Sequence, residues 1–238
     1  MKNSPVKSAV ILAGGLGRRL RGVVENLPKP MAPVKGRPFL EYPIDYWIQQ
    51  GIRHFILSVG WRREVIMKHF GKKYRQAQVE YVVEETPLGT GGGLLLAIKK
   101  LEKDVPFLLL NGDTFFEVPL AEFIRFHSDH KADWTFSLFK TEEKKRYMGM
   151  KIDEDGRIAA LCSDEQSGQW INGGVYLVNP ASLCASICKP NVKLSIEEDI
   201  LPALFTGGSR FFGYVCKGRF IDIGVPEDYL RSPSILTT

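Results

Sequence analysis

Residues 12–31 read Leu-Ala-Gly-Gly-Leu-Gly-Arg-Arg-Leu-Arg-Gly-Val-Val-Glu-Asn-Leu-Pro-Lys-Pro-Met. An apolar run leads into three glycines, which let the backbone approach a ligand closely and point N–H groups at an anion. The arginines that follow add planar guanidinium groups that match phosphate oxygens. Lys29 lies between two prolines of fixed φ, so its position is well defined. The stretch predicts a cradle for phosphate groups, and a nucleoside triphosphate is the first hypothesis for its ligand.

The composition is that of an ordinary globular chain. Its 238 residues are 44% hydrophobic, which is enough for one large α/β domain. The formal charge of +5 is mild, and no block of basic residues appears, which argues against nucleic acid as a partner. No apolar run approaches the length of a transmembrane helix and no leader precedes the first strand, so we expect no membrane association and a cytoplasmic location.

Short apolar runs alternate with helical patterns in the first half. Strands are expected at 8–13, 53–59, 79–83 and 106–110. Helices are expected from Pro38 to about residue 50, over 64–70 and, after a glycine-rich turn at 89–93, over 94–101. This alternation predicts right-handed βαβ units with a largely parallel sheet.

The second half has more strand-like segments and no repeat or linker. Strands are expected at 134–139, 147–152, 157–161, 171–178, 210–215 and 219–223, and helices at 180–188, at 196–206 and from Pro226 onward. We therefore expect one domain over 1–238. Its first half, about 1–115, would bind a nucleotide, and its second half, about 116–238, would close the site.

Two aspartates are expected at the edge of the sheet where open α/β sheets bind ligands. Asp113 follows a buried strand, and Asp222 lies between apolar neighbours. A carboxylate in such a place is costly unless it is paired or holds a metal, and Mg²⁺ favours a few carboxylates together with phosphate oxygens. A loop-capping role explains Asp113 as well as a metal ligand does, and sequence spacing cannot show whether the two aspartates meet.

Several motifs together resemble the sugar-1-phosphate nucleotidylyltransferases, also called NDP-sugar pyrophosphorylases, over nearly the whole chain. They are Gly-Gly-Leu-Gly-x-Arg-Leu from residue 14 with Pro-Lys-Pro-Met at 28–31, Leu-Gly-Thr-Gly-Gly at 88–92, Asn-Gly-Asp at 111–113, Asn-Gly-Gly-Val-Tyr at 172–176, Ser195-x-Glu197-x-Asp199 and the segment 222–229. Within the family, the segments 21–24, 30–34 and 111–116 are most similar to the guanylyltransferases that act on a manno-heptose 1-phosphate. The resemblance implies a Rossmann-like three-layer αβα fold with a mixed, mainly parallel sheet.

The resemblance also implies roles for individual residues. Arg19 would bind the β- and γ-phosphates and Lys29 the α-phosphate, while Asp113 and Asp222 would hold Mg²⁺; Arg19, Lys29 and Asp113 are the expected catalytic set. The residues expected to contact the nucleotide are Leu12, Ala13, Gly14, Gly15, Gly17, Glu84, Gly89 and Thr90. The implied reaction joins GTP to a sugar 1-phosphate and releases pyrophosphate. Whether the chain forms homo-oligomers is left open.

Glu84 is the candidate for reading the base. A carboxylate can accept hydrogen bonds from guanine N1–H and N2–H₂, whereas the carbonyls of uracil or thymine would repel it. Glu85 competes for this role. The alternative is that Glu84 is a solvated residue at a strand end.

On the sugar side, the resemblance offers Asn172 and Gly173 for hydroxyl groups and Glu197 for a diol. A first-turn residue beside a Ser195 N-cap would explain Glu197 as well. Many relatives carry a Glu-Lys pair whose lysine holds the sugar phosphate, but here 162–166 read Cys-Ser-Asp-Glu-Gln. Lys140, Arg146 or the metal are candidates for that task. Arg18 stands where the family usually has threonine.

The sequence leaves alternatives of the same class open, and it lacks features that two other classes would require. A mannose-1-phosphate guanylyltransferase and a uridylyltransferase belong to the same class. A glycosyltransferase with a similar sheet would require an Asp-x-Asp motif, which the Asn-Gly-Asp at 111–113 lacks. A non-catalytic relative that binds nucleotide sugars should have lost Arg19, Lys29 or an aspartate, and all of these are present.

Overall fold

The computed structural model describes residues 6–15, 17, 20, 24, 26–140, 149–162, 170–183 and 192–236, with the side chain of Cys162 left out. Arg18, Arg19 and Arg146 lie outside the described residues, as does most of the helix expected at 180–188.

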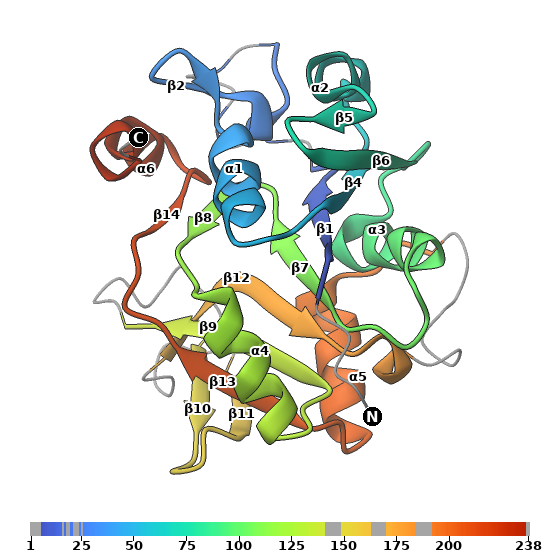
Figure 1. Cartoon of the computed structure of the whole chain (residues 1–238), viewed down its shortest axis with the longest axis vertical. Helices are drawn as coiled ribbons and strands as arrows, with labels where there is room; N and C mark the ends of the chain where they lie inside the picture. The colour runs from blue at the N-terminus through green and yellow to red at the C-terminus, as the bar shows by residue number, and fades with distance from the viewer. Residues whose placement is uncertain are drawn as a thin grey trace.

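A mixed sheet with a parallel centre organises the molecule (Figure 1). The centre consists of β7 (Phe107–Asn111), β1 (Ser8–Ala13), β4 (His54–Val59) and β6 (Ala77–Val83), in that spatial order and all parallel. β12 (Trp170–Val178) lies antiparallel beside β7, so strands from both halves of the chain share one sheet. The remaining strands of this sheet are β5 (Lys73–Tyr74), β9 (Trp134–Phe139), β10 (Gly149–Ile152), β11 (Ile158–Cys162) and β13 (Phe211–Val215).

Two small antiparallel pairs lie outside the main sheet. β8 (Thr114–Phe116) pairs with β14 (Phe220–Asp222), and β2 (Pro33–Val34) pairs with β3 (Arg37–Pro38). The first pair joins a segment from the middle of the chain to one near its end. It therefore sets the position of Asp222 relative to Asp113.

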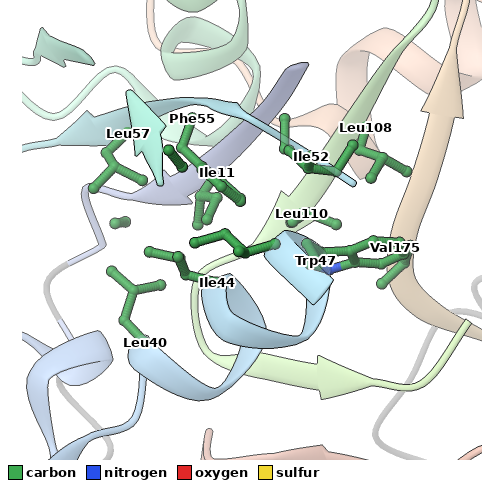
Figure 2. Packing of buried hydrophobic residues seen from close by; sticks show 14 of the residues in the cluster. Ile11, Leu40, Ile44, Trp47, Ile52, Phe55, Leu57, Leu108, Leu110 and Val175 are labelled. Atoms are coloured by element: carbon green, nitrogen blue, oxygen red, sulfur yellow. The ribbon is translucent and has the colours of Figure 1, made fainter. Parts of the chain in front are cut away.

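Helices cover both faces of the sheet because successive side chains of a strand point to opposite sides. Ile11 of β1 belongs to an apolar cluster with residues of α1 (Glu41–Gln49), α2 (Arg63–Phe70) and α4 (Leu120–Asp129). Val10, on the other face, belongs to a cluster with residues of α3 (Gly89–Ala97), the π-helix η6 (Ile196–Ile200) and α5 (Leu201–Thr206). Figure 2 shows Ile44 and Trp47 of α1 packed among residues of β1, β4, β7 and β12. The structure therefore confirms the predicted three-layer architecture.

A third apolar cluster joins the start of the chain to its end. It contains Leu20 and Phe39 from the first forty residues and Ile221 and Leu236 from the last twenty. The final helix, α6 (Pro226–Ile235), follows this segment. The cluster packs the segment that follows the glycine loop against the C-terminal segment that carries Asp222.

The turn expected at 89–93 is wrong, because α3 begins at Gly89. The glycines lie in the helix where it approaches its neighbours closely. A Cβ on Gly91 would lie 2.9 Å from Ile200 Cδ1, and one on Gly93 would lie 2.6 Å from Ser58 Oγ. Glycine at these positions serves helix packing rather than a turn, and this outweighs its low helix propensity.

The helix expected from Pro38 to about residue 50 is confirmed, but its start is wrong, because α1 begins at Glu41. Lys35 and Gly36 both have positive φ, 48° and 77°, which forms the tight turn of the β2–β3 hairpin. Pro38 occupies this hairpin opposite Pro33. Within the helix expected at 196–206, the first five residues form a π-helix instead of an α-helix.

In the described part of the chain, no helix is both long enough and apolar enough to cross a membrane.

Candidate active site

A cavity of about 430 Å³ lies at the carboxyl ends of β1, β6 and β7. Its lining is Leu12, Gly14, Gly15, Glu84, Pro87, Gly89, Thr90, Asn111, Asp113 and Lys193. Seven of the residues expected from the sequence thus lie around one space. This is the edge of the sheet at which an open α/β fold binds ligands.

The glycine loop is pressed between the ends of neighbouring strands. A Cβ on Gly14 would lie 2.3 Å from Glu84 Oε1, and a Cβ on Gly112 would lie 2.6 Å from the Leu12 carbonyl oxygen. Gly17 has a φ of +56°, and a Cβ there would lie 3.1 Å from Lys29 Cβ. The loop therefore needs glycine for close approach at Gly14 and for backbone conformation at Gly17.

Ala13 and Arg19 are also expected to contact the nucleotide. The Ala13 side chain is buried in the apolar core, which leaves only its backbone for a ligand. Arg19 lies outside the described residues.

Lys29 lies at the centre of an ion cluster. Its ammonium group forms an ion pair with Asp113 and lies 3.9 Å from Asp222 Oδ1, while its side chain is only 10% exposed. Asp222 is opposite Thr114 in the β8–β14 ladder, and the Ile223 amide donates to the Asp113 carbonyl oxygen at 3.0 Å. The fold thus answers the question that spacing left open, because the two aspartates meet around one cation.

The two carboxylates fit a divalent cation. They direct oxygen atoms at a point where a positive charge already resides, and hard oxygen donors are the ligands that Mg²⁺ prefers. Within the described residues, no group of three or more His, Cys, Asp or Glu side chains could hold a metal. A metal here would therefore combine Asp113 and Asp222 with oxygen atoms of substrate and water.

Glu84 and Glu85 have different surroundings. The Glu84 carboxylate lines the cavity and accepts hydrogen bonds from Ser58 Oγ at 2.9 Å and from the Leu88 amide at 3.1 Å. Glu85 has a side chain that is 76% exposed and forms an ion pair with Arg63 at 3.0 Å. Glu84 is thus the carboxylate of the two that a ligand in the cavity would meet.

Glu197 reaches the cavity wall through Thr90. The Thr90 hydroxyl donates to Glu197 Oε2 at 3.2 Å and accepts from the Ile196 amide at 2.8 Å. Capping of η6 falls to other residues, since Ser195 Oγ accepts from the Glu198 amide and Asp199 Oδ2 accepts from the Ser195 amide. The geometry therefore gives the cap to Ser195 and Asp199, while Glu197 Oε2 accepts from both the Thr90 hydroxyl and, at 3.1 Å, the Ser195 hydroxyl.

A bulge in β12 shapes the neighbouring wall. Asn172 accepts from the Gly174 amide at 3.1 Å and donates from Nδ2 to the Tyr176 hydroxyl at 2.7 Å. A Cβ on Gly173 would lie 2.4 Å from the Phe116 ring, and Gly174, at a φ of +70°, backs onto Asn111. Asn172 and Gly173 therefore lie in the strand segment that packs against Asn111, a lining residue of the cavity.

Tyr176 lies behind this wall as a fully buried phenol. Burial raises its pKa, and the carboxylates of Glu197 and Asp113 raise the pKa further. The hydroxyl therefore stays protonated, and it accepts a hydrogen bond from Asn172 Nδ2. Tyr176 lies in one of the sequence motifs, but its type and spacing indicated no role, and neither Asn111 nor Lys193 carried a signal for the site.

The fold and this site together define a nucleotidyl transferase. The chain matches the family described as nucleotidyl transferase over residues 8–237, and it belongs to that family. Members of the family generally use a divalent metal ion.

Individual relatives support the subgroup expected from the motifs. The chain is 41% identical over 226 residues to the D-glycero-alpha-D-manno-heptose 1-phosphate guanylyltransferase of Aneurinibacillus thermoaerophilus, covering 94% of this chain and 96% of the relative. It is 33% identical to the mannose-1-phosphate guanylyltransferase of Mycobacterium tuberculosis, covering 96% of this chain and 64% of that one. The crystal structure of HddC from Yersinia pseudotuberculosis matches with a TM-score of 0.83 and 34% identity, over 96% of this chain and 99% of that chain.

Replacing Lys29 tests the ion cluster. Lys29→Met would leave Asp113 and Asp222 facing each other without their cation, so we expect the free energy of unfolding to fall by about 1–3 kcal/mol in the absence of divalent metal. Added Mg²⁺ should raise the melting temperature of the variant more than that of the wild type, because the metal then supplies the missing charge. Urea and thermal unfolding measure both effects. The exposed Lys72→Met variant is the control. Equal stability and equal metal response in Lys29→Met and wild type would contradict the assigned cluster.

Proposed function

We propose that this chain transfers the guanylyl group of GTP to a sugar 1-phosphate, best assigned as D-glycero-D-manno-heptose 1-phosphate, giving a GDP-sugar and pyrophosphate. The observation that carries the proposal is the single cavity in which the glycine loop, Glu84 and Asp113 meet. The site thereby combines a place for a triphosphate, a carboxylate suited to guanine and a metal-type carboxylate.

The proposed reaction is one displacement at the α-phosphorus of GTP. An oxygen of the sugar phosphate, already ionised at neutral pH, forms the new P–O bond as the bond to the β-phosphate oxygen breaks and pyrophosphate leaves. No protein side chain has to remove a proton. Catalysis then consists of alignment and charge stabilisation, as in other phosphoryl transfers.

The phosphate-binding roles follow from the loop and the ion cluster. Backbone amides of Gly14, Gly15 and Gly17 are proposed to bind the triphosphate, and Arg19 the β- and γ-phosphates. Lys29, now held by Asp113, would turn its ammonium group to the α-phosphate, where negative charge spreads in the transition state. A Mg²⁺ ion on Asp113 and Asp222 would supply further neutralisation of the phosphate oxygens when bound.

The base preference follows from Glu84. Its carboxylate is oriented by Ser58 and by the Leu88 amide, yet each carboxylate oxygen can accept more than one hydrogen bond. Guanine N1–H and N2–H₂ are therefore suitable donors to it. Gly89 and Thr90 are proposed to complete the nucleotide side of the lining.

The sugar side is proposed to use Glu197, Asn172 and Gly173 for hydroxyl groups. The heptose assignment is supported by the heptose 1-phosphate guanylyltransferase that is 41% identical to this chain. Mannose 1-phosphate is the second candidate, because a mannose-1-phosphate guanylyltransferase is 33% identical over nearly the whole chain. Cytoplasmic location and homo-oligomer formation stay predictions.

A matrix of substrates tests the proposed function. GTP, UTP, dTTP, CTP and ATP are each combined with manno-heptose, mannose and glucose 1-phosphates in the presence of Mg²⁺, and pyrophosphate release is measured. We expect the highest kcat/KM for GTP with the heptose 1-phosphate. Absence of release with every pair would refute the transferase, and a clear preference for UTP would refute the base assignment.

Glu84→Gln tests the reading of guanine. The neutral amide can present an N–H₂ group toward the N–H donors of guanine, so kcat/KM with GTP should fall by roughly 10–100-fold. The fall in kcat/KM with UTP should be smaller. Glu85→Gln is the matched control, since Glu85 pairs with Arg63 at the surface. An unchanged ratio of GTP to UTP in Glu84→Gln would remove Glu84 from base recognition.

A further inference from the structure

Lys193 contributes a positive charge to the wall of the active-site cavity. It lies in the segment that leads into η6, and the backbone of this segment is fixed on the first turn of α3. The Leu194 amide donates to the Leu88 carbonyl oxygen at 2.9 Å, and the Gly91 amide donates to the Leu194 carbonyl oxygen at 2.8 Å. The base of the Lys193 side chain is therefore held in place although the side chain itself is exposed.

The residue that follows Lys193 is held by an apolar contact. Leu194 packs on α3, where a Cβ on Gly91 would lie 2.9 Å from Leu194 Cβ. The chain is extended at Ser195, with φ −95° and ψ 140°. Leu194 is thus held against α3, while Lys193 before it contributes to the lining of the cavity.

Lys193 is the cation of the described cavity wall that is available to bind an anionic ligand. Glu84 and Asp113 line it, and Glu197 reaches it through Thr90. Lys193 is the only basic residue of the lining, and it has no ion pair with a carboxylate, as far as the described residues extend. Lys29, by contrast, is already engaged by Asp113 and Asp222.

Lys140, an earlier candidate for the sugar phosphate, is engaged elsewhere. Its ammonium group lies 4.7 Å from the centre of the Trp170 ring, in a cation–π contact, and it is not part of the described lining of the cavity. Lys193 instead lies four residues before Glu197, on the segment proposed to hold the sugar hydroxyl groups.

We infer that Lys193 binds the phosphate group of the sugar 1-phosphate, where many relatives use a lysine from the region equivalent to 162–166. This inference rests on the proposed function and adds a substrate-binding residue to it. A lysine ammonium is a compact charge on a flexible stem, suited to a phosphate that must keep one oxygen free to attack. The contact would also place that oxygen toward the α-phosphate of GTP.

The test compares Lys193→Met with Lys193→Arg and with Lys103→Met, an exposed lysine near the opposite end of β7. KM for the sugar 1-phosphate should rise roughly 10–100-fold in Lys193→Met, whereas KM for GTP should change less than about threefold, since one charge-assisted contact to one substrate is lost. Lys193→Arg should recover most of the affinity, and Lys103→Met should behave as the wild type. Thermal unfolding should be the same for all four proteins because both lysines are exposed.

Calorimetric titration with mannose 1-phosphate measures the same contact without turnover. Wild-type affinity and wild-type KM for the sugar 1-phosphate in Lys193→Met would overturn the inference, and so would a rise confined to KM for GTP. A different result would refute the proposed function: the wild-type protein would release no pyrophosphate with any sugar 1-phosphate. In that case, weaker binding of mannose 1-phosphate to Lys193→Met than to wild type would still support the phosphate contact.

Discussion

The ion cluster of Lys29, Asp113 and Asp222 is the constraint on which the site depends. The Lys29 and Asp222 side chains are only 10% and 18% exposed, and such charges are costly to keep away from water unless they meet opposite charges. Their three positions come from the segment after β1, from the end of β7 and from the end of β14, so the cluster can form only when the start, middle and end of the chain come together. The β8–β14 ladder and the apolar cluster around Phe39 and Ile221 hold them there.

The charges of Lys29, Asp113 and Asp222 stabilise the fold when no substrate is bound, and they are proposed to take part in the reaction when substrates are bound. Without substrate, the lysine neutralises the aspartates. In the proposed reaction, phosphate oxygens of the substrates would compete for the lysine, and the two carboxylates would hold a divalent cation. Two further carboxylates are oriented by hydrogen bonds before any substrate binds. Ser58 and the Leu88 amide donate to Glu84, and Thr90 donates to Glu197. Such preorganised charge is the main means by which enzymes stabilise phosphoryl transfer.

The sequence predicts the layers well because apolar runs and their period determine which faces are buried. The sequence also predicts a phosphate-binding edge at the carboxyl ends of the strands, since glycine, lysine and aspartate in loops there are typical of sites that bind phosphate groups and metal ions. It favoured Glu84 over Glu85 but could not show which of the two faces the cavity, because adjacent residues differ only in the direction that the fold gives them. It misjudged the glycines at 89–93, whose purpose is contact with Ile200 and Ser58 from distant segments. Lys193 carried no local signal at all, since its place in the cavity depends on the pairing of Leu194 with α3.

Direct transfer between two substrates aligned in one cavity is tested most directly by the stereochemical course at the α-phosphorus. One diastereomer of GTP with sulfur on the α-phosphate is converted with the sugar 1-phosphate, and the configuration of the thio-substituted GDP-sugar is determined by phosphorus NMR. A single in-line displacement predicts inversion. Retention would show two displacements through a guanylylated protein side chain, and would contradict a site that works by alignment and charge alone.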